Sequence, residues 1–187
     1  MKAARRTWFA RVAAAAPARL IFLDETWFST AMARSHGHAP VGERLVDAVP
    51  LRHWTTATFV AGLTAGGLIA PRLLGGPMTG ATFEDYLRRA RLPAARPGDV
   101  LVLDNLAAHK TRGVRAALAA GGLAVRYLPA YSPDRNPIEQ VFSKFKRLAR
   151  SAAERSVEGL RKLVRSLARK LRPDECANYI HHAGYPL

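Results

Sequence analysis

Three acidic side chains stand at positions suited to metal-dependent phosphoryl chemistry. Asp24 and Asp104 each follow an apolar run, and Glu139 lies at the start of an amphipathic segment. Acids at the ends of apolar strands are costly unless they are solvated, paired or bound to metal. Mg²⁺ and Mn²⁺ prefer carboxylate oxygens, and two such ions about 3.5–4 Å apart activate an attacking hydroxyl and stabilise the leaving oxygen. The three acids are therefore candidate catalytic residues and ligands for two Mg²⁺ or Mn²⁺ ions.

Each acid also has a simpler explanation. Asp24 or Asp104 taken alone fits a strand-end cap or a salt-bridge partner. The dipole of a helix favours an acid such as Glu139 in its first turn. The spacing of the acids alone leaves these explanations open beside the metal site.

The hydropathy pattern predicts a mixed sheet flanked by helices. Apolar, β-prone runs and turn residues predict strands at 54–64, 68–74 and 123–129, and a turn followed by a buried strand within 97–105. The segment 20–28 begins as an apolar strand, which Asp24 and Glu25 are expected to end. Helical periodicity and cap signals predict helices at 83–92 (capped by Thr82 and ended by Pro93), 110–120, 137–152 and 157–171. Residues 34–53 are predicted to form a loop or an irregular hairpin, and Pro71 restricts its strand to an edge or a bulge. This order matches the α/β ribonuclease-H-like fold with a C-terminal helical tail.

The charge balance points to an anionic partner. The 187 residues include 29 Lys and Arg against 14 Asp and Glu, for a net charge of +15. Nucleic acid is the usual partner of so basic a protein; anionic lipid, an acidic protein or a solvated cationic face are the alternatives. The segment between Gln140 and Pro173 contains eleven basic and two acidic residues. Surfaces rich in Lys and Arg commonly bind phosphates without recognising the base sequence. Lys144 and Arg147 follow Glu139 by roughly one and two helical turns and are candidate DNA phosphate contacts.

Compartment signals are few. The single Cys176 excludes an internal disulfide and a cysteine-based zinc cluster, and it fits a reducing cytosol. No apolar run approaches the roughly 20 residues that span a membrane. Arg11 and Arg19 interrupt the alanine-rich N-terminus, which we interpret as an amphipathic helix and lead-in and not as a targeting peptide. We expect a cytoplasmic, nucleoid-associated bacterial protein without a membrane partner.

The sequences around the three acids resemble the catalytic blocks of transposases of the insertion-sequence 630 family, within the mariner superfamily. These blocks are LDETWF, GDVLVLDNLAAHK and YLPAYSPDRNPIEQVFSKFK, and 34 residues lie between Asp104 and Glu139, similar to the family's DD(34)E pattern. The resemblance covers residues 20–187. It implies that Asp24, Asp104 and Glu139 are the first, second and third catalytic acids. It also implies metal-dependent hydrolysis at transposon ends and strand transfer into target DNA, usually at a TA dinucleotide.

Four neighbouring residues are assigned supporting roles. Strand alternation points Glu25 away from the acid before it, so we assign it support and not catalysis. Asn105 and His109 fit the second block. Three roles are open for His109: a contact to the scissile phosphate, orientation of the second acid, or a structural hydrogen bond. Asn136 is a candidate cap of the last catalytic helix. Trp27 is interpreted as a core or rim residue and not as a base-stacking platform.

The predicted organisation is a basic N-terminal helix and lead-in (1–19), a DDE catalytic domain (20–152) and a C-terminal helical extension packed on it (153–187). Related transposases carry helix-turn-helix units before the first catalytic Asp, whereas 23 residues precede Asp24 here. We therefore expect end recognition from an upstream helix-turn-helix module on a separate or fused frame. The chain is then a frameshift product, an excised domain or a decayed copy. The implied partners are transposon-end DNA, target DNA and further copies of the chain in a synaptic complex.

Two other functions remain open at this point. One is a non-catalytic DNA-binding or regulatory remnant that occupies transposon ends or dimerises with an intact transposase. The other is a stand-alone ribonuclease-H-like nuclease that acts on hybrid or branched nucleic acid.

Overall fold

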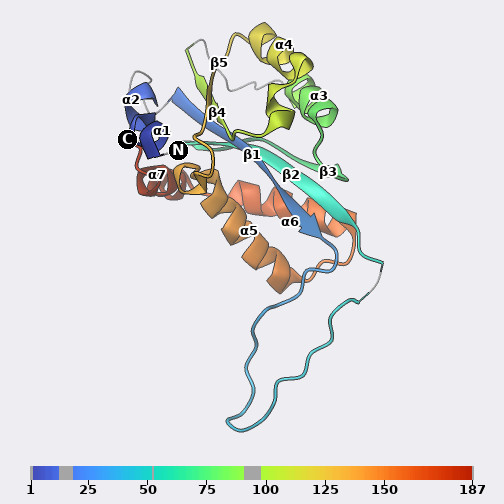
Figure 1. The fold of residues 1–187 in the computed structure, drawn as a ribbon. Coiled ribbons are helices and arrows are strands. Elements are labelled where there is room, and N and C mark those ends of the chain that lie inside the picture. Colours follow the sequence, from blue (N-terminus) through green and yellow to red (C-terminus); the bar gives the residue numbers. More distant parts are fainter. Residues whose placement is uncertain (1, 13–18, 52, 91–97, 187) are drawn as a thin grey trace.

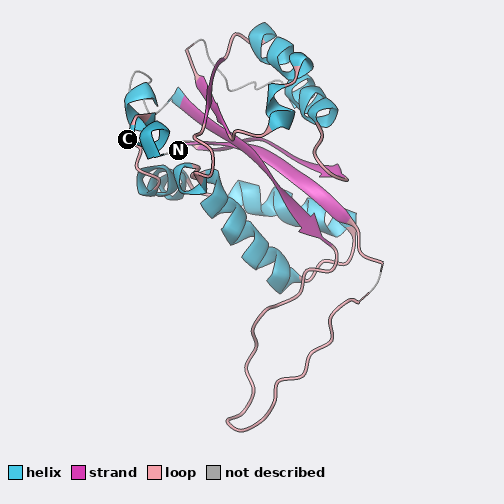
Figure 2. Cartoon of the chain, viewed as in Figure 1, coloured by secondary structure: helices cyan, strands magenta, loops and turns pink. Residues whose placement is uncertain are grey.

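One five-stranded sheet with helices on both faces forms the centre of the protein (Figures 1 and 2). The computed structural model describes residues 2–12, 19–51, 53–90 and 98–186. The strands, in chain order, are β1 (Leu20–Ser29), β2 (Thr56–Thr64), β3 (Gly67–Gly75), β4 (Val100–Leu103) and β5 (Ala124–Tyr127). Their order in the sheet is β3-β2-β1-β4-β5, with β1, β2 and β3 antiparallel and β4 and β5 parallel to β1. The expected mixed sheet is confirmed.

The helices form two layers, one on each face of the sheet (Figure 1). The upper layer in this view holds α3 (Gly80–Ala90) and α4 (Arg112–Ala120), and the lower layer holds α5 (Ile138–Ala152), α6 (Val157–Lys170) and α7 (Pro173–His182). Alternate side chains of β1 serve the two layers. Ile21 and Leu23 belong to the core with α3 and α4, whereas Leu20 and Phe22 belong to the core with α5, α6 and α7. No helix among the described residues is long and apolar enough to cross a membrane.

Two short helices at the N-terminus, α1 (Lys2–Arg6) and α2 (Trp8–Val12), lie beside the C-terminal end of the chain (Figure 1). The indole N–H of buried Trp8 donates a hydrogen bond of 2.8 Å to the Tyr185 hydroxyl. That hydroxyl donates in turn to the carbonyl of Arg135 at 2.8 Å. The N-terminal region is thereby tied to the last described residues and to the loop before α5.

Several helix boundaries differ from the prediction. Thr79, and not Thr82, caps α3: the Thr79 hydroxyl accepts from the Thr82 N–H, and the Thr82 hydroxyl accepts from the Thr79 N–H, both at 3.2 Å. This reciprocal pair is a capping box, which places the cap three residues earlier. Pro93, expected to end this helix, lies outside the described residues. The described part of 1–19 holds two short helices in place of one.

The segment predicted as one helix over 110–120 is divided. A short 3-10 helix, η2 (Ala107–Lys110), precedes α4, and Thr111 between them caps α4 by accepting from the Val114 N–H at 3.3 Å. The expected stop is confirmed, because Gly121 ends the helix and Gly122 takes a positive φ of 65°.

The hairpin contains the irregularity expected from Pro71. β3 is an edge strand, and its pairing with β2 shifts register between Val60 and Gly62, opposite Ala70 and Pro71. Ala70 has φ of 48°, so the backbone is bent where proline has no N–H to donate.

A long arm projects from the sheet between β1 and β2 (Figure 1). Its described residues within 34–53 form no helix or strand, so of the two predicted forms the structure shows a loop and not an irregular hairpin. The arm is closed at its base, where the Thr30 N–H donates to the Thr55 carbonyl at 3.1 Å and the Thr55 N–H donates to the Thr30 hydroxyl at 2.9 Å.

Candidate active site

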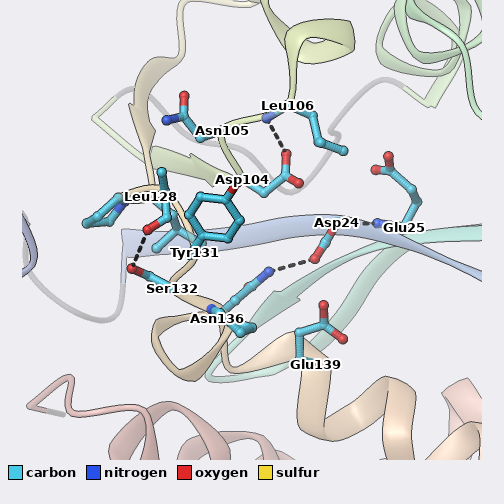
Figure 3. A pocket seen from close by; sticks show the side chains of 13 residues that line it. Asp24, Glu25, Asp104, Asn105, Leu106, Leu128, Tyr131, Ser132, Asn136 and Glu139 are labelled. Atoms are coloured by element: carbon cyan, nitrogen blue, oxygen red, sulfur yellow. Dashed lines mark hydrogen bonds between the residues drawn. The ribbon is translucent and has the colours of Figure 1, made fainter. Parts of the chain in front are cut away.

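The three predicted catalytic acids line one cavity of about 640 Å³ (Figure 3). Asp24 comes from β1, Asp104 directly follows β4, and Glu139 projects from the first turn of α5. The remaining wall is formed by residues 128–133 and Asn136 of the loop before α5, together with Glu25, Asn105 and Leu106. The fold therefore brings together residues that are up to 115 positions apart in sequence.

The sequence led us to expect that Asp24 ends its strand, and this is wrong: Asp24 lies within β1. β1 continues to Ser29 because it pairs with β2 along that whole length, including Asp24 opposite Ala61. On its other edge β1 pairs with β4 only as far as Phe22 opposite Val102. Beyond that point the edge of β1 is free, and the cavity occupies the space that β4 leaves.

The Asp24 carboxylate is almost completely buried, at 6% exposure. Oδ1 accepts the Glu25 backbone N–H at 2.8 Å, and Oδ2 accepts the side-chain amide of Asn136 at 2.6 Å (Figure 3). Burial raises the pKa of Asp24 well above its usual value, and the negative charges of Glu25, Glu139 and Asp104 raise it further. A cation in the cavity would relieve both effects.

Asp104 is held by two groups on one oxygen. Oδ1 accepts the Leu106 N–H at 3.1 Å and lies 2.6 Å from Nδ1 of His109. His109 is fully buried against the Phe83 ring, and its Nε2 lies 3.2 Å from Oε2 of Glu25. These are ion-pair contacts, since neither ring N–H is aligned for a good hydrogen bond. Burial favours a lower pKa for His109, but the two flanking carboxylates outweigh it and raise the pKa to about 9.

Glu25 and Asp24 point to opposite faces of β1, as strand alternation predicts. Glu25 contacts His109 on the side of α3, whereas Asp24 contacts Asn136 on the side of α5. Both nevertheless line the cavity, because the edge of β1 between them is not covered by β4.

Asn136 does not cap α5, contrary to the sequence interpretation. Pro137 occupies the cap position, and no side chain in the described part of the chain caps the helix. The Asn136 side chain is buried and is directed instead to Asp24, which lies 112 residues earlier in sequence. The Nδ2 group donates to the Asp24 carboxylate, and Oδ1, which a cap would use to accept a backbone N–H, has no hydrogen-bond partner among the described residues.

The loop that presents Asn136 is clamped by Arg5 of α1. The Arg5 guanidinium donates to Asp134 through two bonds of 2.9 and 2.6 Å. It also donates to the Ser132 hydroxyl at 2.8 Å and to the Tyr131 carbonyl at 3.1 Å. Tyr131 has φ of 55°, so the loop holds a strained residue next to the site. No pattern in the sequence indicated this contact.

Lys146 is a further neighbour of the site that sequence reasoning did not single out. It lies seven residues after Glu139, so the two share one face of α5. Burial raises the pKa of Glu139, the Lys146 charge lowers it, and Asp104 and Glu25 raise it. The Lys146 ammonium lies 4.8 Å from the centre of the Trp27 ring, which is 53% exposed and is therefore not a core residue. The spacing of seven residues was the signal available.

The predicted phosphate contacts lie outside the cavity. Lys144 is paired with Glu175 of α7, and Arg147 is exposed with no ion pair among the described residues. Asn105 does line the cavity, and its side-chain carbonyl accepts from Lys110.

The sequence model of the DDE superfamily endonucleases matches residues 19–161, a span that includes all three acids. The chain belongs to this family. No curated protein matches it by sequence. Its fold is similar to Mos1 transposase in a paired-end complex with the left transposon end, with a TM-score of 0.80 and 21% identity over 97% of this chain and 57% of that one. The fold is also similar to the Mos1 mariner transposase in a paired-end complex with Mn, with a TM-score of 0.78 and 22% identity over 97% of this chain and 57% of that one. It is similar as well to the catalytic domain of Mos1 transposase alone, with a TM-score of 0.68 and 19% identity over 97% of this chain and 85% of that one.

These likenesses confirm the predicted ribonuclease-H-like fold. This DDE endonuclease chain spans 57% of the length of Mos1 transposase in that complex.

The donor set of the cavity fits hard divalent cations. Asp24, Asp104 and Glu139 offer only carboxylate oxygens, the ligands that Mg²⁺ and Mn²⁺ prefer. Within the described residues, no three such side chains are yet close enough to share one ion. Burial raises the pKa values of Asp24 and Glu139, and the negative charges of neighbouring carboxylates raise them further. This DDE endonuclease site is therefore suited to cations, which would draw the carboxylates together.

Proposed function

We propose that the chain is the catalytic domain of a DNA transposase of the insertion-sequence 630 type, which cleaves DNA at transposon ends and joins the 3′-hydroxyl to target DNA. The supporting observation is the convergence of Asp24, Asp104 and Glu139 on one cavity in a DDE endonuclease. The net charge of +15 suits a polyanionic substrate. The likeness to Mos1 transposase, solved in paired-end and strand transfer complexes, supports transposition as the reaction.

In this proposal the three acids hold two Mg²⁺ or Mn²⁺ ions, which when bound activate the attacking hydroxyl and stabilise the leaving oxygen. The other residues fix the carboxylates. Asn136 orients Asp24 through its 2.6 Å hydrogen bond. His109, fully buried, acts as a positioning residue for Asp104 and not as a phosphate contact, and Glu25 holds its far side.

The proposal includes the predicted organisation and partners. Residues 20–152 form the catalytic domain, 1–19 the lead-in, and 153–187 an extension that is packed on it. Buried residues of α6 and α7 share one core with the sheet, which supports this packing. An upstream helix-turn-helix module, self-association in a synaptic complex and a location at the bacterial nucleoid belong to the same proposal. Arg147 remains a candidate phosphate contact, whereas Lys144 must first leave Glu175.

The decisive test is DNA nicking by the purified chain, alone and fused to its upstream frame. The substrate is labelled DNA with the inverted repeats that flank its gene, incubated with Mg²⁺ or Mn²⁺. We expect metal-dependent nicking at the repeat end that Asp104→Ala abolishes. Asp85→Ala is the matched control, because Asp85 is exposed on α3 and pairs only with Arg89 among the described residues.

Other results would contradict the proposal. DNA binding without cleavage under any pairing would indicate a regulatory remnant. Preferential cutting of RNA–DNA hybrids would indicate a ribonuclease-H-like nuclease.

A further inference from the structure

The outward face of α6 carries a row of basic side chains around a shallow hollow of about 410 Å³. The helix buries Leu160 and Val164 against the core. At about 3.6 residues per turn, Lys162, Arg165 and Arg169 lie on the opposite side of the helix and project outward. Four of the residues that line the hollow are exposed cations: Lys162, Arg165, Arg169 and Lys170. We call these four the α6 row.

The charge of the α6 row is not compensated. None of its members forms an ion pair with a described acid. Neighbouring cations do: Arg161 pairs with Glu158, and Arg172 pairs with Asp174. Four positive charges therefore stand within about 12 Å of helix, at a rise of about 1.5 Å per residue. Such a concentration of like charge is unfavourable until an anion neutralises it.

The geometry of the row fits a polyanion. Its members are long, exposed side chains along a line, and a small anion would instead need buried, convergent donors. Along the helix axis, Lys162, Arg165 and Arg169 are about 4.5 and 6 Å apart. Phosphates of one DNA strand rise by about 3.4 Å per nucleotide, so the three cations can reach neighbouring phosphates of one strand.

An anionic membrane fits this face less well. Membrane-surface helices place large apolar side chains beside their cations. Of the large apolar side chains exposed in the described part of the chain, none belongs to α6. The chemistry of the row is that of a phosphate backbone without a lipid phase.

The α6 row lies apart from the catalytic cavity. The two hollows share no lining residue. α6 packs against α5 and β3 in the layer below the sheet, whereas the cavity opens where β4 ends (Figure 1). We propose that the α6 row is a second, sequence-independent surface that binds the backbone of duplex DNA outside the catalytic cavity. This inference rests on the proposed function only in taking DNA as the partner.

The test compares two triple variants of equal charge. In the first, Lys162, Arg165 and Arg169 are replaced by Gln. In the control, Gln replaces Arg88, Arg89 and Arg161, each of which is paired with an acid on its own helix. Binding of a random-sequence 30-base-pair duplex is followed by fluorescence anisotropy from 50 to 200 mM salt. No metal is added, so the result does not depend on cleavage, and absence of nicking by the wild type would count only against the proposed function.

We expect the slope of log K against log salt to be less steep in the first variant, its magnitude smaller by about 2.7, since each phosphate contact contributes about 0.9. Over a fourfold change in salt, that slope amounts to about 40-fold in affinity. The control should retain the wild-type slope. An unchanged slope in the first variant, or an equal fall in both, would overturn the inference. So would a fall seen only with duplex RNA or phosphatidylserine vesicles. If the triple variant does not fold, each single replacement should lower the slope by about 0.9.

Discussion

Asn136→Ala tests whether the amide of Asn136 sets the properties of the first catalytic acid. Asn136 is 4% exposed and donates to Oδ2 of Asp24 at 2.6 Å. Among the described residues, no other side chain donates a hydrogen bond to Asp24. A hydrogen bond to a charged group contributes about 1.5–3 kcal/mol. Its loss should therefore raise the pKa of Asp24 further, because the charged form of the carboxyl group loses a hydrogen-bond donor.

The effect should be visible as weaker metal binding. Because burial already raises the pKa of Asp24 well above its usual value, a metal ion competes with a proton for the carboxylate. At 1.4 kcal/mol per tenfold, the variant should need about 10–100 times more Mn²⁺ for half-saturation near neutral pH. The deficit should shrink as pH rises, since the proton then leaves without the help of the metal.

The assay is calorimetric titration of Mn²⁺ into the metal-free protein at several pH values, without DNA. Asn178→Ala is the matched control, because Asn178 is exposed on α7, outside the cavity. Unchanged Mn²⁺ affinity in a folded Asn136→Ala protein would refute the reasoning. A deficit that is equal at low and high pH would show that Asn136 orients the carboxylate without tuning its pKa.

Three further predictions follow from the same contacts. Because the pKa of Asp24 is raised on folding, stability is lost as the pH rises above about 3.8. Metal-free Asp24→Asn should therefore melt at a higher temperature than the wild type at pH 7, by about 2–4 °C for each kcal/mol relieved. Near pH 3, the variant and the wild type should melt at the same temperature. Tyr185→Phe leaves the buried indole N–H of Trp8 unpaired and should lower the free energy of unfolding by about 1–3 kcal/mol in a denaturant titration. Arg5→Glu should weaken Mn²⁺ binding by releasing the loop before α5, and adding Asp134→Arg should restore it; a double variant as weak as the single one would refute the clamp.

The sheet was predictable because its strands carry local signals. The run VLVL is buried at all four positions, and Gly121-Gly122 stops the preceding helix pattern as expected. The full length of β1 was not predictable, because the two acids before its last four residues, TWFS, indicate the end of a strand. These four residues belong to β1 because they pair with β2. Strand length here is a tertiary property, decided by the partner strand.

The site was predictable in its acids and not in their supports. Blocks of sequence and the interval of 34 residues identified the acids that line the cavity. The contact of Asn136 with Asp24 spans 112 positions, and that of Arg5 with Asp134 spans 129. No local pattern encodes such pairs, since each depends on how separate elements pack. Local reasoning offered Asn136 the nearest role, a helix cap, and the buried carboxylate overrode it.

The cavity exists because β1 is longer than β4, and Asp104 itself ends β4. Its Oδ1 accepts the N–H of Leu106 two residues later, an Asx turn that bends the chain away from β1. The edge of β1 is thereby uncovered at Asp24 and Glu25, on both faces of the strand. The same Oδ1 is held by His109, which leaves Oδ2 of Asp104 without a hydrogen-bond partner among the described residues. One carboxylate thus both opens the cavity and offers it a free oxygen, so replacing Asp104 by Asn should preserve the turn and the cavity while removing the charge that a cation needs.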